Sequence, residues 1–192
     1  MFVIIAAVGK KNELGNANKL IWHIKADMKH FRETTMGKKV LMGRKTFESL
    51  PNLLPGRKIY VATKNENISG DNVEAVKDLD AFIARYQHSD EEIFICGGAE
   101  IYNKFLPYAN RMLITEIFDT AKEADTYFPD VDYKDWDIGL KTFGYYKKKG
   151  KAKPLYWQIL EFTRSWLNKK TFSNFRGRFL FNNYLDYRNL LN

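Results

Sequence analysis

Short runs of apolar residues alternate along the chain with segments whose apolar positions recur at helical spacing. Near-continuous Val, Ile and Leu runs are typical of strands that are covered on both faces of a sheet. Strands that alternate with helices indicate parallel pairing through crossover helices. The predicted strands are Phe2–Val8 and residues 40–43, 59–63, 93–96 and 112–115, and the predicted helices cover residues 26–35, 79–86 and 98–105.

The pattern changes after Tyr127. Trp136–Tyr146 and residues 155–162 look like two strands, joined by the very polar residues 147–153. We expect an antiparallel pair that finishes the sheet and has a mobile hairpin tip. The predicted fold is a single α/β domain, in which a central, mostly parallel sheet ends in an antiparallel C-terminal strand and is flanked by helices.

Residues 163–192 follow neither pattern. They hold six Lys or Arg residues, one Asp and seven aromatic residues with no clear period. We therefore place a boundary at Phe162, between a domain of residues 1–162 and a basic, aromatic extension of residues 163–192. The extension could pack on the domain, join two copies of the chain or stay unfolded. Basic and aromatic residues together also suit single-stranded nucleic acid, although a nucleic-acid partner is not what we expect.

Composition and charge narrow the class of protein. The 192 residues are 45% hydrophobic, which is enough for one folded core. The net charge is +8, but residues 163–192 supply +5 of it, so the body is only mildly basic and suits anionic small ligands. A single cysteine, Cys96, excludes an intrachain disulfide. With no signal peptide or membrane span indicated, we expect a cytoplasmic protein.

Asp27 is the first candidate for chemistry. It stands at the start of a predicted helix, four residues before Phe31 and shortly after Trp22. One interpretation is an acid favoured by the helix dipole. The other is a pocket carboxylate among apolar rings, which would have a raised pKa and could pair with a cationic, amidine-like ring.

Two strand ends carry glycines. Gly43 precedes Arg44, Lys45 and Thr46, and the pair Gly97-Gly98 follows the next apolar strand. Glycine lets a backbone approach a phosphate closely, and a new helix offers free N–H groups. Ordinary tight turns would explain both segments equally well. There is no G-x-G-x-x-G fingerprint, so a standard Rossmann site is not supported.

A turn at residues 54–57 delivers Arg57 to the start of another strand. A forked guanidinium there could clamp a carboxylate, or form a surface ion pair. Thr63 and Lys64 close that strand and could meet a phosphate. The three histidines have no metal-ligand spacing, so no metal site is expected, and motifs for serine hydrolysis and phosphoryl transfer are absent.

In this order, the motifs resemble those of the dihydrofolate reductase family over residues 2–162. The resemblance implies reduction of 7,8-dihydrofolate to 5,6,7,8-tetrahydrofolate by NADPH in one-carbon metabolism, with hydride transfer to C6 of the pterin. The motifs are Ile4-Ile5-Ala6-Ala7, Leu14-Gly15 with Leu20 and Trp22, Asp27 with Phe31, residues 42–49 and 54–57, Gly97-Gly98 with Tyr102, Thr115, and residues 125–129.

The resemblance also implies roles for individual residues. Asp27 would hold the 2-amino group and N3 of the pterin, Thr115 would bond to Asp27, and Trp22 would position a water. Ordered water would protonate N5 while the loop of residues 9–22 closes over the site. The implied folate site is Ile5, Ala7, Asp27, Met28, Phe31, Arg32, Leu50, Leu54, Arg57 and Thr115, with Arg57 on the α-carboxylate of the glutamate tail.

The implied NADPH site spans both glycine segments, and the Gly97–Gly98 peptide bond is expected to be cis. Its residues are Ala7, Leu14, Gly15, Leu20, Gly43, Arg44, Lys45, Thr46, Thr63, Lys64, Cys96, Gly97, Gly98, Ala99, Glu100, Ile101 and Tyr102.

The chain departs from the family pattern at three places. Ile21 stands where proline is usual, Glu100 stands where relatives often have a basic residue, and residues 163–192 have no counterpart in short bacterial-type members. A rival is the pyrimidine reductase of flavin biosynthesis, which shares the NADPH motifs. Trp22, Asp27, Phe31 and Arg57 favour folate.

Overall fold

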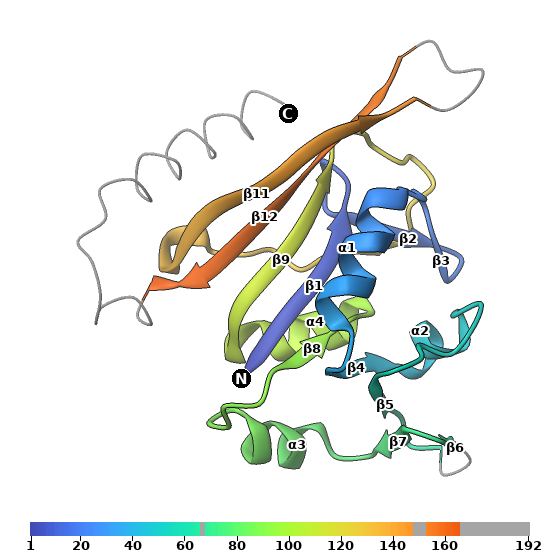
Figure 1. Cartoon of the computed structure of the whole chain (residues 1–192), viewed down its shortest axis with the longest axis vertical. Helices are drawn as coiled ribbons and strands as arrows, with labels where there is room; N and C mark the ends of the chain where they lie inside the picture. Colours follow the sequence, from blue (N-terminus) through green and yellow to red (C-terminus); the bar gives the residue numbers. More distant parts are fainter. Residues whose placement is uncertain (66–67, 148–152, 166–192) are drawn as a thin grey trace.

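The computed structural model describes residues 1–65, 68–147 and 153–165, and within them one large sheet forms the centre (Figure 1). Its strand order is β11-β12-β9-β1-β8-β4-β5-β7-β6. The strands are β1 (Phe2–Val8), β4 (Lys39–Gly43), β5 (Lys58–Ala62), β6 (Ser69–Gly70), β7 (Val73–Val76), β8 (Ile93–Ile95), β9 (Ala109–Ile117), β11 (Trp136–Tyr146) and β12 (Leu155–Arg164).

Strand pairing confirms the predicted fold. β1 runs parallel to both β8 and β9, and β4 runs parallel to β8 and β5. β12 is antiparallel to β9 on one side and to β11 on the other. The five strands that the sequence predicted in the body are therefore adjacent, and their carboxyl ends meet at one edge, where ligands bind in open α/β sheets.

Helices cover both faces of this sheet. They are α1 (Lys25–Thr35), α2 (Arg44–Glu48), α3 (Leu79–Tyr86) and α4 (Ala99–Phe105), with 3₁₀ turns at Leu106–Tyr108 and Tyr133–Asp135. Phe31 of α1 and Phe47 of α2 pack on one core cluster, while Phe82 of α3 and Phe105 of α4 belong to the other. Asp78 caps α3, because its side chain accepts from the backbone N–H of Asp80 and of Ala81.

A second, small sheet joins part of residues 9–22, which the sequence indicated only as a loop, to residues 126–127. It consists of β10 (Thr126–Tyr127), β2 (Glu13–Asn16) and β3 (Lys19–Leu20). Ala17 and Asn18, between β2 and β3, both have positive φ angles, of 48° and 60°. Two such residues form the tight turn that joins hairpin strands.

Some boundaries differ from the prediction. β9 starts at Ala109 rather than at residue 112. The prediction missed its first residues because Asn110 is polar, but Asn110 is buried and its side-chain oxygen accepts a hydrogen bond from the N–H of Phe2. β7 was not predicted, since only its two ends are buried. β12 runs on to Arg164, two residues beyond the boundary placed at Phe162. Of the hairpin tip, residues 148–152 lie outside the described residues.

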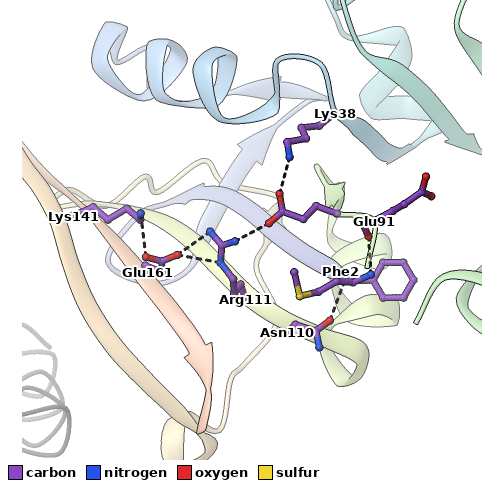
Figure 2. A network of polar contacts seen from close by, with 9 residues as sticks. Phe2, Lys38, Glu91, Asn110, Arg111, Lys141 and Glu161 are labelled. Carbon is purple, nitrogen blue, oxygen red and sulfur yellow. Dashed lines mark hydrogen bonds and ion pairs between the residues drawn. The ribbon is translucent and has the colours of Figure 1, made fainter. Parts of the chain in front are cut away.

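A chain of ion pairs crosses the sheet on the side of α1 (Figure 2). Arg111 of β9 lies at its centre and binds Glu92 at 2.8 Å and Glu161 of β12 at 2.8 Å. Lys38 binds Glu92 and Lys141 binds Glu161, each at 3.0 Å. Side chains from three strands and from the residues just before two others are thus held together near the amino ends of the parallel strands.

None of the helices in the described ranges is both long and apolar enough to cross a lipid bilayer.

Candidate active site

Asp27 lies in the first turn of α1 and is bound to the sheet by a hydrogen bond from Thr115 of β9. Thr115 is itself buried and pairs with Ala7 of β1, so the carboxylate lies at the carboxyl ends of the two central strands. Burial raises the pKa of Asp27, and the Thr115 hydrogen bond and the nearby His30 offset only part of that increase. No basic side chain in the described ranges forms an ion pair with Asp27.

The apolar residues that the sequence predicted for the folate site fall into two neighbouring clusters. Ile5, Phe31, Leu50 and Leu54 belong to one core cluster, together with Cys96. Ala7 and Trp22 belong to the adjoining cluster around Ile24. These clusters would give a flat, aromatic ligand an apolar wall beside the carboxylate.

Met28 and Arg32 differ from the other predicted folate residues. Both side chains are exposed, because they lie one position further round α1 than Asp27 and Phe31. The structure therefore brings them only to the rim. Leu20, predicted for the cofactor site, is likewise exposed, on β3.

Arg57 is the most informative residue of the site. Its side chain is 5% exposed, so it forms no surface ion pair. It donates to Thr35 Oγ1 at 2.8 Å, to the Pro55 carbonyl at 3.0 Å and to the Arg32 carbonyl at 3.1 Å. All three acceptors are neutral, and no carboxylate of the described chain binds it. Burial lowers the pKa of Arg57.

A guanidinium has five N–H donors, so Arg57 keeps donors for an anion after these three bonds are made. Thr35 is fully buried and donates to the Phe31 carbonyl at 2.7 Å, which fixes the oxygen that accepts from Arg57. The fork is thus held in one orientation beside Phe31, whose ring centroid lies 5.9 Å from the guanidinium carbon. Such a group is suited to a carboxylate.

The glycine segments meet because β4 and β8 are neighbours. The Gly97–Gly98 peptide is cis, as the resemblance implied, and Gly97 has a φ of 103°. The Gly43 N–H donates to the Gly97 carbonyl at 2.7 Å. A Cβ added to Gly98 would lie 3.4 Å from Thr46 Oγ1, and one on Gly43 would lie 3.3 Å from Ile101. Without side chains, the two backbones approach closely and leave a polar main-chain surface.

The predicted cationic groups of the cofactor site differ in their surroundings. Arg44 binds Glu48 one turn further on, at 2.9 Å, in an exposed pair. Such pairs contribute little stability, so Arg44 can exchange its carboxylate for a phosphate. Thr63 Oγ1 accepts from the Asn65 N–H at 3.0 Å, and Lys64 beside it is exposed. Glu100 is also exposed, in the first turn of α4.

The segment of residues 9–22 is held by carboxylates that the sequence analysis did not single out. The Trp22 indole N–H donates to Asp119 at 3.0 Å, and the Ala17 N–H donates to Asp125 at 2.8 Å. Glu13 is buried and accepts from the Ala121 N–H at 3.0 Å. Asp119 and Asp125 are far from residues 9–22 in sequence, so no local pattern linked them to this segment. Asp125 appeared only as part of the motif of residues 125–129.

This segment also reaches the cofactor side. Asn18 donates to the Lys45 carbonyl of α2 at 2.8 Å, and the Gly15 carbonyl accepts from the Asp125 N–H at 3.1 Å. The small sheet therefore bridges the loop before β10 and the helix after Gly43. We refer to residues 9–22 as the lid, after the role that the resemblance implies.

Comparisons with known proteins agree with this geometry. Residues 1–164 match the family model of dihydrofolate reductase. The chain is 42% identical over 127 residues to dihydrofolate reductase type 3 of Salmonella typhimurium, covering 66% of this chain and 77% of that protein. It is 37% identical over 150 residues to the dihydrofolate reductase of Neisseria gonorrhoeae, covering 78% and 91%.

The fold is similar to that of a solved structure, dihydrofolate reductase from Enterococcus faecalis complexed with NADP(H) and RAB-propyl. The TM-score is 0.70 and the identity 24%, covering 85% of this chain and 96% of that one.

Proposed function

This chain belongs to the dihydrofolate reductase family, and from that premise we propose that Asp27 and Arg57 are the two charged groups that bind dihydrofolate. The reaction is the NADPH-dependent reduction of 7,8-dihydrofolate to 5,6,7,8-tetrahydrofolate. The family match also decides against the pyrimidine reductase of flavin biosynthesis as the identity of the chain.

Asp27 carries the proposal for the pterin end. Its carboxylate accepts from the 2-amino group and N3 of the ring, and Thr115 orients it. The ionised carboxylate favours a protonated pterin beside it, and no other described acid faces this position, so water protonates N5. When closed, the lid of residues 9–22 excludes bulk water from the reacting ring. Trp22 can position a water only when its N–H leaves Asp119.

Arg57 carries the proposal for the glutamate tail. Burying a cation whose protein partners are all neutral costs free energy unless an anion pairs with it. The α-carboxylate of the tail is such an anion, and Leu50, Leu54 and Phe31 supply the apolar surface between it and the pterin.

The two glycine segments and the cationic residues beside them fit NADPH. Gly43, Gly97 and Gly98 would let the backbone approach the phosphates, and Arg44, Thr63 and Lys64, which follow the neighbouring strands β4 and β5, would bind a 2′-phosphate. When bound, NADPH supplies the hydride for pterin C6. The value of kcat/KM should therefore be at least about 10-fold higher with NADPH than with NADH, since one charge-assisted bond is worth about 1.5 kcal/mol or more.

The decisive test is the variant Asp27→Asn. We expect kcat near pH 7 to fall by about 10²-fold or more, and part of it to return at low pH, where the substrate is protonated without help. Glu33→Gln, an exposed acid on the same helix, is the matched control and should keep full activity. Near-normal turnover of Asp27→Asn at pH 7 would refute the assignment.

We also propose a cytoplasmic location, because a reducing compartment suits a chain whose one cysteine, Cys96, is a free thiol.

A further inference from the structure

An exposed apolar stripe runs along the β11–β12 hairpin. Leu140, Phe143 and Tyr145 of β11 and Tyr156 of β12 are each more than half exposed, and Phe143 reaches 75%. We refer to these four residues as the hairpin stripe. Exposed large apolar side chains gathered on one element indicate a surface that is covered by something else.

Strand register places the hairpin stripe on a single face. Leu140 pairs with Leu160, Phe143 with Gln158, and Tyr145 with Tyr156, so these side chains point to the same side of the sheet. The rings of Tyr145 and Tyr156 lie 6.1 Å apart. Further back on this face, Ile138 and Leu160 are buried in the core that α3 and α4 cover. The stripe therefore continues the core beyond the helices that cover it (Figure 1).

We propose that residues 166–192 of this same chain pack on the hairpin stripe. This segment starts directly after Ser165, beside the Arg164–Trp136 pair at the base of the hairpin. It holds seven aromatic residues, Trp166, Phe172, Phe175, Phe179, Phe181, Tyr184 and Tyr187. The family match ends at residue 164, so the segment lies beyond the family domain.

Length and charge suit this occupant. From Trp136 to Tyr145 the strand extends about 30 Å, which a helix of about 20 residues or a shorter extended segment would cover. Residues 166–192 hold five Lys or Arg and one Asp, while residues 130–137, which lead into β11, hold four Asp and one Lys. The segment and the base of the hairpin are thus opposite in charge.

Tethering decides between this segment and a second copy of the chain. A segment joined to the base of the hairpin meets the stripe at an effective concentration of about millimolar. A second copy at micromolar concentration competes poorly with it. The proposal is independent of the catalytic assignments, since none of the stripe residues lies in the folate or NADPH site.

The test compares the reactivity of two neighbouring positions in the full chain. Phe143→Cys places a thiol on the stripe, whereas Thr142→Cys places one on the opposite face, because Thr142 pairs with Ile159. Each is made in the parent and in a tail variant in which Phe175, Phe179 and Phe181 are replaced by Ser. The rate of reaction with a small maleimide is measured, with the rate of Cys96 in the parent subtracted.

We expect the thiol at 143 to react at least about 10-fold faster in the tail variant than in the parent, and the thiol at 142 to react equally in both. In the parent, the slow reaction of the thiol at 143 should not depend on protein concentration, and the protein should have the mass of a monomer in solution. Equal rates at 143 would overturn the proposal. Protection that disappears on dilution together with a dimer would overturn it as well, in favour of a second copy.

A double-variant cycle gives a second readout. Tyr145→Ser should lower the Tm of the full chain by about 3 °C or more and leave the Tm of the tail variant nearly unchanged. Leu53→Ser removes another apolar side chain that is more than half exposed, from a distant loop, and is the control, with the same small effect in both backgrounds. Equal losses from Tyr145→Ser in the two backgrounds would show that the segment and the stripe do not interact.

Discussion

The α1 side of the sheet carries two groups of charges, and they are paired in opposite ways. Near the amino ends of the strands, Arg111 binds two glutamates, and each glutamate binds a lysine as well. Asp27, at the carboxyl ends of the strands, and Arg57, which directly precedes β5, form no ion pair with another described residue: Thr115 donates to Asp27, and Arg57 donates to three neutral oxygens. The first group links strands by ion pairs, and in our proposal a ligand completes the second.

The difference shows which charged groups of this protein are available to bind a ligand. Desolvating a charge costs free energy that a partner charge must offset. In the ion-pair chain each charge is offset by another side chain of the protein, so these charges contribute nothing to the binding of a ligand. In the site the fold leaves one anion and one cation uncompensated, which makes them a match for a molecule that is cationic at one end and anionic at the other.

The largest expected effect tests the cation of the site. Arg57→Lys keeps the charge but loses the fork, so kcat/KM for dihydrofolate should fall by about 10²-fold, mainly through KM. A dihydropterin that lacks the glutamate tail is the control substrate and should be reduced by the variant as well as by the parent. An equal loss with both substrates would mean that Arg57 acts by holding α1 against β5 instead.

The next effect tests the centre of the ion-pair chain. Arg111→Met leaves Glu92 and Glu161, which are 20% and 28% exposed, without their shared cation. We expect the free energy of unfolding to fall by about 2 kcal/mol and the Tm by about 5 °C. Steady-state kinetics at 25 °C should stay within about twofold of the parent, since the chain lies at the other end of the strands from Asp27.

Replacing both glutamates by Gln in the Arg111→Met background should change the stability little further, because Glu92 and Glu161 then keep only their partly exposed pairs with Lys38 and Lys141. A further loss as large as that of Arg111→Met would show that these two lysine pairs stabilise the fold without Arg111.

A smaller effect concerns the stability of the site at different pH values. Burial raises the folded-state pKa of Asp27 above its unfolded value of 3.8, so the fold favours the protonated acid. Below pH 3.8 both states are protonated, and the stabilising contribution is lost as the pH rises through the folded pKa. Asp27→Asn should therefore have a higher Tm than the parent at pH 7, and the difference should shrink toward pH 4. A lower Tm at pH 7 would contradict an uncompensated carboxylate.

The smallest effect is expected at the outer end of the ion-pair chain. Lys141 is 40% exposed and binds only Glu161, which Arg111 also binds. Lys141→Met should change the free energy of unfolding by less than about 0.5 kcal/mol, and added salt should remove even that difference. A loss as large as that of Arg111→Met would show that the chain acts as one cooperative unit.

Sequence patterns predicted the parts of the molecule that are locally determined. Apolar runs located the five body strands, and the spacing of Asp27 and Phe31 placed both on the inner side of α1. Arg57 was less clear, because an arginine after a Pro-Gly turn is equally consistent with a surface ion pair. Only its burial and its three neutral acceptors exclude the surface ion pair, and they leave the carboxylate site as our proposal.

The remaining features depend on residues that are distant in sequence. Asp119 and Asp125 hold the lid from about a hundred positions away, and nothing local marks them. The pairing partners of Arg111 lie in two different strand segments. The β2–β3 turn was missed because Ala17 adopts a positive φ angle, which sequence patterns assign to glycine, asparagine or aspartate.

The position of β1 has a consequence for biosynthesis. β1 leaves the ribosome before the other described strands, yet it is central in the sheet, and its neighbours are β8 and β9, at residues 93–95 and 109–117. At a translation rate of about 5–20 residues per second, β1 waits roughly 5–20 seconds for both partners. During that time an almost uncharged apolar strand is exposed on the nascent chain. The domain is thus obliged to fold late in its own synthesis, and its earliest segment is the one that most needs protection by chaperones.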